Sequence, residues 1–285
     1  MSGKTALLIC GAGSRGIIQL GMLKAIKDLN IHYDAVYAGS VGALNGMLFL
    51  QDEMDKLEDM WLTVRNQDVY TARLLSLWKL FTNDASVHDS APLEKLIRKY
   101  LNLDKIKSLP IPFIVNATNL STYKTEAKDM RTLELEGAVR WIKASASPPI
   151  LFPSVTQDAC EYIDSGILNN YFINQTVKDG YETLICLTPT NAPMSKLRNL
   201  LNIIEATIST SSYGYLDREK QSVDEINREI KECGKDQNFI NLIIIRPPVP
   251  WSQGLIDFNY KEDRKSLIQY GYNLAYEKLK GGTLT

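Results

Sequence analysis

The sequence predicts a three-layer α/β/α fold with a mainly parallel central sheet. Short, continuous apolar runs at residues 6–10 and 242–245 are typical of central strands that are covered on both faces. Segments with helical periodicity alternate with such runs along the chain, as they do in α/β proteins. No Pro/Gly/Ser-rich linker divides the 285 residues, so we expect a single domain over residues 1–285.

Seven strands are expected from apolar or β-branched runs that are bounded by turn residues. Six of them belong to a core of about residues 5–190, and the seventh belongs to a C-terminal part of about residues 195–280. The predicted strands are residues 5–10, 35–38, 112–118, 123–128, 161–163, 183–187 and 241–246.

Helices are expected where apolar residues recur at helical spacing. One face of residues 17–29, for example, carries Ile18, Met22, Leu23, Ile26 and Leu29. Residues 89–92 form a start signal that ends in proline, which fits the first turn of the helix that follows. The predicted helices are residues 17–29, 41–50, 93–101, 199–215, 222–233 and 262–280.

A helical insertion into the core is expected at about residues 52–108. Such an apolar set is typical of a core helix, and it also suits a mobile lid or a lipid-facing wall over a site. The sequence leaves these two interpretations open. The side chains concerned are Trp61, Tyr70, Leu74, Leu75, Leu77, Trp78, Leu80 and Phe81.

Composition argues against several classes of function. The net charge of −1 gives no electrostatic reason to expect binding to nucleic acid or to an anionic membrane surface. No apolar stretch reaches the roughly 18 residues of a spanning helix, and the N-terminal apolar run is too short for a signal peptide. Four widely spaced cysteines without a C-x-x-C pair predict reduced thiols, so we expect a cytoplasmic protein.

Ser40 stands between a predicted strand and a predicted helix, within the run Ala38-Gly39-Ser40-Val41-Gly42. This is the outline of a nucleophile elbow, in which a sharp turn exposes a serine at the head of a helix. The residues two before and two after the serine must be small, and they are Ala38 and Gly42. The outline alone leaves both catalysis and an ordinary strand-turn-helix open.

Residues 11–16 satisfy the pattern G-x-G-x-x-G after a strand and before a helix. A dinucleotide-binding fold also requires an acidic residue at the end of its second strand. That position holds Ser40, and the nearest acid, Asp34, precedes the strand. Backbone N–H groups on a glycine-rich turn can instead stabilise the oxyanion of a tetrahedral intermediate. We favour this oxyanion loop over the nucleotide loop.

A serine nucleophile requires a base, and the chain contains only two histidines, His32 and His88. Both are expected to be solvated or capping residues, so the sequence argues against a Ser-His-Asp triad. The remaining arrangement is a carboxylate that accepts the serine proton directly. Asp164 is the candidate because it ends a predicted strand before Ser165 and Gly166, although the start of an Asx-turn would explain it equally.

Taken in order, residues 11–16, 38–42 and 164–170 resemble the signature of patatin-like phospholipases. Residues 144–153 resemble the segment between nucleophile and acid in that family, and residues 258–275 resemble its bacterial C-terminal helix. The resemblance extends over nearly the whole chain and implies a patatin-like version of the predicted fold.

The resemblance implies a lipid acyl hydrolase, of the phospholipase A or carboxylic ester hydrolase type, that needs no metal and no cofactor. Ser40 would attack the ester carbonyl, and Asp164 would accept its proton and then activate water. The backbone N–H groups of Gly11, Ala12 and Gly13 would form the oxyanion hole. The implied partner is a lipid or acyl-ester substrate, with only transient contact to a membrane or micelle surface.

One residue adds to this resemblance and three residues depart from it. Arg15 matches a basic position of the family, where it would order the loop or face an anionic head group; a surface charge at a helix start is the alternative. Ala12, Ala38 and Ser165 stand where the family has glycine.

Two other classes of function therefore stay open. One is a patatin-fold regulatory or binding protein without turnover, and the other is a dinucleotide-dependent oxidoreductase. Acyl transfer to an alcohol is a further variant of the reaction.

Overall fold

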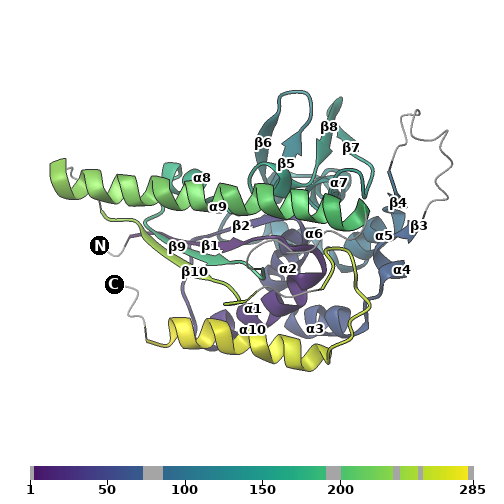
Figure 1. Cartoon of the computed structure of the whole chain (residues 1–285), viewed down its shortest axis with the longest axis horizontal. Helices are drawn as coiled ribbons and strands as arrows, with labels where there is room; N and C mark the ends of the chain where they lie inside the picture. Colours follow the sequence, from purple (N-terminus) through teal and green to yellow (C-terminus); the bar gives the residue numbers. More distant parts are fainter. Residues whose placement is uncertain (1–2, 73–85, 191–199, 234–237, 250–252, 282–285) are drawn as a thin grey trace.

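The computed structural model describes residues 3–72, 86–190, 200–233, 238–249 and 253–281. Within these residues, eight strands form one mixed sheet that has helices on both sides (Figure 1). The predicted three-layer α/β/α fold is confirmed.

Five parallel strands form the centre of the sheet, and shorter antiparallel strands extend it at one side. All seven predicted strands belong to this sheet, and β7 is its one strand among the described residues that was not expected. The order across the sheet is β10 (Asn241–Ile245), β9 (Thr183–Leu187), β1 (Thr5–Ile9), β2 (Ala35–Gly39), β5 (Phe113–Asn119), β8 (Cys160–Ile163) and β7 (Val155–Gln157), while β6 (Lys124–Asp129) pairs with β5.

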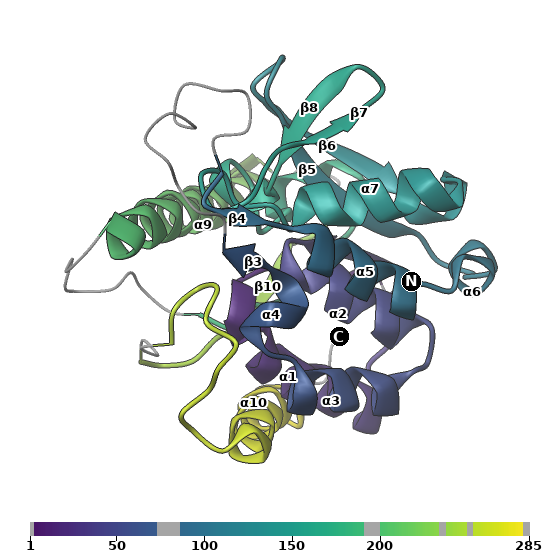
Figure 2. The ribbon, with the colours of Figure 1, turned by 90° about the vertical axis from the view of Figure 1, so that its right-hand side faces the viewer.

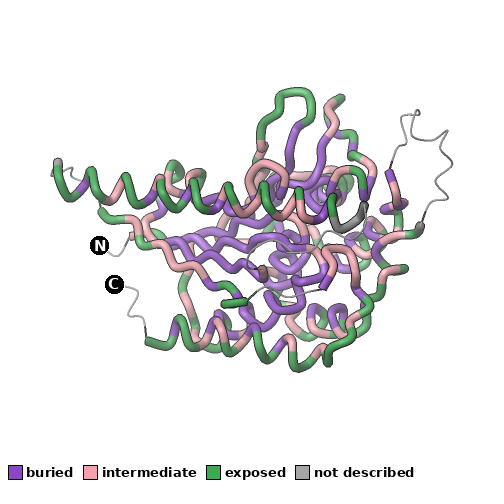
Figure 3. The backbone as a smooth tube through the Cα atoms, viewed as in Figure 1, coloured by how far each residue is buried: buried purple, intermediate pink, exposed green. Residues whose placement is uncertain are grey.

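Two hydrophobic cores lie on the two faces of the sheet, and alternate side chains of β1 contribute to each. Leu7 and Ile9 belong to the core beneath α1 (Gly16–Asp28), α2 (Val41–Leu50) and α10 (Arg264–Leu279). Leu8 and Cys10 belong to the core beneath α8 (Ile173–Lys178) and α9 (Leu200–Cys233). Figure 3 shows the result, with buried strands in the middle and exposed outer faces on α9 and α10.

The helix α9 corrects one prediction, because the sequence indicated two helices at residues 199–215 and 222–233. The intervening residues contain no glycine or proline, and they continue the buried stripe. Leu216 and Val223 are buried, and the Glu219 carboxylate between them accepts the backbone N–H groups of Ile173 and Asn174 at the start of α8. Contact with α8 and the sheet therefore holds α9 as one long helix across this face.

Within the described residues, the predicted insertion of residues 52–108 contains four helices and a two-stranded sheet: α3 (Met54–Thr63), α4 (Asn66–Val69), β3 (Thr71–Ala72), β4 (His88–Asp89), α5 (Ala91–Tyr100) and α6 (Leu103–Lys107). Its predicted apolar residues from 74 to 81 lie outside the described residues. The sequence did not indicate α8 or α7 (Leu135–Ser145), which packs beside α5 (Figure 2).

The edges of β5 determine where the chain presents Asp164. One edge of β5 pairs with β6 along its whole length, so β2 and β8 share the other edge. β2 pairs with β5 only up to Asn116, and β8 takes over at Thr118 and Asn119. The end of β8 therefore lies directly beyond the end of β2, where Ser40 begins the turn into α2.

Helices α1 and α10 cross at a contact that only glycine permits. A Cβ atom on Gly271 would lie 1.9 Å from the Ile18 carbonyl oxygen, and one on Gly21 would lie 1.9 Å from the Ile268 carbonyl oxygen. Both obstacles are backbone atoms, so side-chain rotation cannot relieve them. The two glycines thus set how closely the C-terminal helix packs on the sheet layer.

We expect Gly271→Ala to destabilise the protein by about 1–3 kcal/mol, because the added methyl group must push α10 away from α1. Urea unfolding followed by circular dichroism measures the change. Gly214→Ala in α9 is the matched control, since nothing lies within 4 Å of its added Cβ atom. It should be neutral or stabilising by up to about 1 kcal/mol. Equal stability of Gly271→Ala and the wild-type protein would contradict the close crossing.

Candidate active site

Ser40 occupies a strained turn between β2 and α2. Its backbone has φ 52° and ψ −137°, in a region that residues other than glycine rarely adopt. Gly42 allows the turn to approach β1, because a Cβ atom there would lie 2.0 Å from the Ile9 carbonyl oxygen. Ala38, which stands where glycine was expected, is fully buried in β2.

The side chain of Asp164 points to this serine from the end of β8. Ser40 Oγ donates a hydrogen bond of 2.7 Å to Asp164 Oδ2, and the Gly166 N–H donates one of 2.7 Å to Oδ1. The carboxyl group is buried, and this desolvation raises the pKa of Asp164 to about 7 although both hydrogen bonds oppose the shift. Asp164 also begins the turn at Ser165 that the alternative interpretation required. The same residue therefore both accepts the hydrogen bond from Ser40 and starts this turn.

The last residue of α7 and a residue just beyond its end hold the backbone N–H groups of Ser40 and Asp164. Ser145 Oγ accepts the Ser40 N–H at 2.9 Å, and the Ser147 carbonyl accepts the Asp164 N–H at 2.9 Å. Sequence reasoning assigned no role to these serines. The only signal was the resemblance of residues 144–153 to a family segment.

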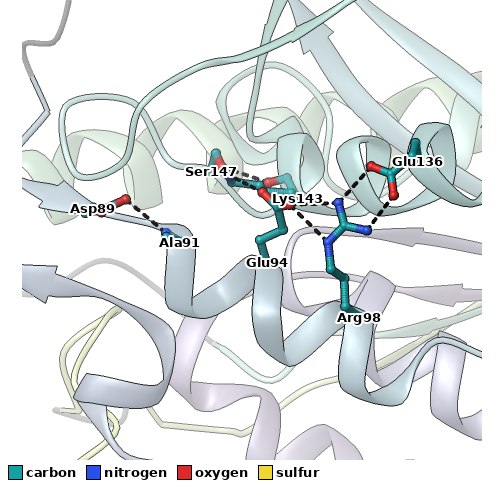
Figure 4. A network of polar contacts seen from close by, with 7 residues as sticks. All are labelled: Asp89, Ala91, Glu94, Arg98, Glu136, Lys143 and Ser147. Atoms are coloured by element: carbon teal, nitrogen blue, oxygen red, sulfur yellow. Dashed lines mark hydrogen bonds and ion pairs between the residues drawn. The ribbon is translucent and has the colours of Figure 1, made fainter.

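A surface network attaches α7 to α5 (Figure 4). Arg98 on α5 binds Glu136 on α7 through two hydrogen bonds of 2.6 and 2.8 Å, and it also contacts Glu94. Lys143 on α7 reaches Glu94 at 2.9 Å, and these two cations hold the pKa of Glu94 below its usual value. Exposed pairs of this kind contribute little singly. Their shared arginine fixes the relative position of two helices that border the site.

The glycine-rich loop lies directly against Ser40. A Cβ atom on Gly11 would lie 2.1 Å from the Ser40 Cβ atom, so only glycine allows this approach. Gly13 has φ 55°, and its space is limited by the Leu255 carbonyl oxygen. Ala12 has φ −163°, which lies outside the left-handed region that favours glycine. Its methyl group is therefore compatible with the loop.

Asn170 holds this loop in place, a role that sequence reasoning missed. Its Nδ2 group donates to the Gly11 carbonyl at 2.7 Å, and its Oδ1 atom accepts the Gly11 N–H at 3.0 Å. This bond removes Gly11 from the predicted oxyanion donors. Among the described residues, no acceptor pairs with the N–H groups of Ala12 or Gly13.

Arg15 is buried, so the expectation of a surface charge at a helix start is wrong. Its guanidinium forms an ion pair of 2.5 Å with Glu205 on α9 and donates to the Gln253 carbonyl at 2.7 Å. These contacts fit the alternative role, in which the arginine orders the loop. Glu205 neutralises its charge.

The two histidines lie apart from the Ser40–Asp164 pair. His32 is exposed and contacts Asp34 at 3.2 Å. His88 is neither solvated nor a cap, in contrast to the prediction, because it packs against the rings of Tyr70 and Phe152. Burial lowers the pKa of His88, since it disfavours the charged imidazolium.

Two pockets meet at Ser40 and Asp164. The first, here called the apolar pocket, has almost entirely apolar walls apart from those two residues. The insertion supplies much of this wall, including Met60, Trp61, Val64, Val69, Leu93 and Leu96. The second, here called the polar pocket, has a mixed lining that is richer in polar side chains, among them Arg15, Asn170, Thr190, Ser209, Ser212 and Tyr213.

These observations define a class of protein, an α/β fold whose elbow serine is hydrogen-bonded to a buried carboxylate between two pockets. The sequence model of the family described as patatin-like phospholipase matches residues 7–177. The chain belongs to this family.

Curated relatives cover the chain at low identity. Lysophospholipase NTE1 of Cryptococcus neoformans is 27% identical over 183 residues, which are 63% of this chain and 11% of that protein. Lysophospholipase nte1 of Aspergillus terreus is 24% identical over 295 residues, which are 98% of this chain and 18% of that protein. The chain thus spans between about a tenth and a fifth of the length of these relatives. The chain is also similar to the solved structure of VipD from Legionella pneumophila, with a TM-score of 0.49 and 15% identity. That match covers 98% of this chain and 67% of the VipD chain.

No helix among the described residues has both the length and the apolar character that crossing a membrane requires. Nor do they contain a group of three or more histidine, cysteine, aspartate or glutamate side chains placed to hold a metal ion.

Burial of Asp164 predicts an unusual pH dependence of stability. Its pKa is about 7 in the folded protein and about 3.9 in an unfolded chain. The folded state therefore binds the extra proton, and stability falls as the pH rises towards and through 7. Asp164→Asn removes this effect. We expect the variant to gain about 2–3 kcal/mol over the wild-type protein between pH 5 and pH 8.

Urea unfolding of both proteins at the two pH values measures this gain. Asp104→Asn, which removes an exposed carboxylate on α6, is the matched control and should follow the wild-type pH dependence. A constant difference between Asp164→Asn and the wild-type protein would show that Asp164 titrates normally.

Proposed function

We propose that the protein is a lipid acyl hydrolase in which Ser40 is the nucleophile and Asp164 the general base. The observation that carries the proposal is the 2.7 Å hydrogen bond from Ser40 Oγ to Asp164 Oδ2, at the junction of the apolar and polar pockets. Membership of the patatin-like phospholipase family supports the same class of reaction.

The first half of the reaction follows from this geometry. Asp164 accepts the Ser40 proton while Oγ bonds to the ester carbonyl carbon, and the carbonyl oxygen becomes an oxyanion. The N–H groups of Ala12 and Gly13 are the donors we assign to that oxyanion. When the tetrahedral intermediate collapses, the bond to the alcohol breaks and the proton on Asp164 passes to the leaving oxygen. An acyl-enzyme on Ser40 remains.

The second half uses the same groups with water as nucleophile. Asp164, ionised again, takes a proton from water as the water oxygen bonds to the acyl carbon. Collapse of the second intermediate releases the fatty acid and returns the proton to Ser40 Oγ. A base with a pKa near 7 suits both steps, because about half of it is ionised at neutral pH and it is still basic enough to accept a proton.

The pockets indicate how an ester substrate is oriented. An acyl chain fits the apolar pocket, whose walls include Trp61, Phe152 and Phe258, and the polar alcohol portion fits the polar pocket. A single apolar pocket at the serine suits a substrate with one acyl chain. The curated relatives in the comparison are named lysophospholipases, which agrees with this orientation.

Hydrolysis of a short-chain nitrophenyl ester tests the dyad. We expect Ser40→Ala and Asp164→Ala each to lower kcat by roughly a thousandfold or more, because each removes a group that acts in every step. Ser108→Ala, an exposed serine that bonds only within its own turn, is the matched control and should retain full activity. Equal turnover by the wild-type protein and both dyad variants would refute the assignment.

A fluorophosphonate probe separates this proposal from a binding protein without turnover. The probe should label the wild-type protein and not Ser40→Ala. If the wild-type protein is folded by circular dichroism but neither reacts with the probe nor cleaves the ester, the fold serves binding instead.

The pH profile of the wild-type enzyme provides a separate prediction. Since Asp164 acts as a base, only its ionised form is active, and its pKa is about 7. We expect kcat/KM to rise about tenfold per pH unit below pH 7 and to level off above about pH 8. The measurement uses an ester without ionisable groups. A profile that is flat from pH 5 to pH 9 would argue against a buried carboxylate as base.

A further inference from the structure

Arg246 stands at the same edge of the sheet as the glycine-rich loop. It follows the last residue of β10, whose Ile245 carbonyl accepts the Thr188 N–H at 3.0 Å. The neighbouring Leu187 carbonyl accepts the Cys10 N–H at 3.1 Å. The ends of β10, β9 and β1 are therefore level, and parallel strands present their ligands at this edge.

The guanidinium of Arg246 contacts a side chain that lines the polar pocket. Its Nη1 atom donates a hydrogen bond of 2.6 Å to the hydroxyl of Tyr213 on α9, and its Cζ atom lies 5.6 Å from the centre of that ring. Tyr213 lines the polar pocket together with Ser209 and Ser212 of the same helix. The arginine is thus held beside the pocket, although most of it is exposed.

Charge distinguishes the two arginines of this region. Arg15 lines the polar pocket, but its charge is paired with Glu205 at 2.5 Å. For Arg246, no carboxylate of the described residues lies within ion-pairing distance. A planar guanidinium with free N–H groups is the side chain best suited to bind a phosphate through two hydrogen bonds. Among the residues that the structure describes, Arg246 is therefore the cation we assign to an anionic group at this pocket.

We propose that Arg246, positioned by Tyr213, binds the phosphate of the substrate's head group. This inference rests on the proposed function and makes its substrate class narrower. The enzyme would prefer monoacyl phosphate esters of glycerol to neutral acylglycerols. The acyl chain would occupy the apolar pocket, the ester would lie at Ser40, and the glycerol would cross the polar pocket. Ser40 and Arg246 follow strands that are three spacings apart, about 14 Å at the backbone, which a glycerophosphate and an extended arginine side chain can bridge.

The test compares two esters with the same chain, lauroylglycerol and lauroylglycerol phosphate, both as monomers. We expect Arg246→Gln to lower kcat/KM for the phosphate ester at least about tenfold more than for the neutral ester. Arg246→Lys keeps the charge without the planar fork and should give an intermediate ratio. Arg228→Gln, an exposed arginine farther along α9, is the matched control and should leave the ratio unchanged. Equal effects of Arg246→Gln on both esters would overturn the inference.

A binding measurement separates this inference from the proposed reaction. In a Ser40→Ala background, calorimetry reports the affinity for lauryl phosphate without turnover. Arg246→Gln should weaken that affinity about tenfold, and added salt should reduce the difference. An unchanged affinity would refute the phosphate site. If the affinity falls but the wild-type protein hydrolyses neither ester, the phosphate site stands and the proposed hydrolase activity fails.

Discussion

Two hydrogen bonds from one amide side chain connect the loops on which the candidate site depends. Asn170 binds both the carbonyl and the N–H of Gly11, and it comes from the segment that follows Asp164. Because Gly11 lies against Ser40, this contact fixes the glycine-rich loop, the elbow and the acid segment relative to one another. None of the three segments is adjacent in sequence, so their mutual geometry depends on this tertiary contact.

The same close packing explains the raised pKa of the Asp164 carboxyl group. Asp164 lies at the ends of β2, β5 and β8, in contact with Ser40. Among the described residues, its carboxylate accepts two hydrogen bonds, one from Ser40 and one from Gly166. An ionised carboxyl group in such a place is destabilised, and its pKa rises to about 7. In the reaction that we propose, the burial that lowers stability at neutral pH also makes the aspartate basic enough to act without a histidine. Stability and reactivity are opposed at this one residue under that proposal.

Local signals in the sequence defined most of the fold. The apolar strands, the elbow at Ser40 and the turn after Asp164 all follow from short patterns of residue types. The features that could not be predicted from the sequence depend on contacts between distant parts of the chain. Asn170 and Gly11 are 159 residues apart, and Arg15 and Glu205 are 190 residues apart. The polar stretch within α9 resembled a break because only the folded chain shows that Glu219 is buried against α8.

The glycine pattern at residues 11–16 illustrates why a motif needs its surroundings. In a dinucleotide-binding fold, such a loop leaves room for a pyrophosphate close to its backbone. Here Ser40 fills that room, since its Cβ atom lies where even one added carbon on Gly11 would collide. The first N–H group of the loop is also engaged by Asn170. A loop in this position has no space for a diphosphate, but its next two N–H groups are adjacent to a serine hydroxyl.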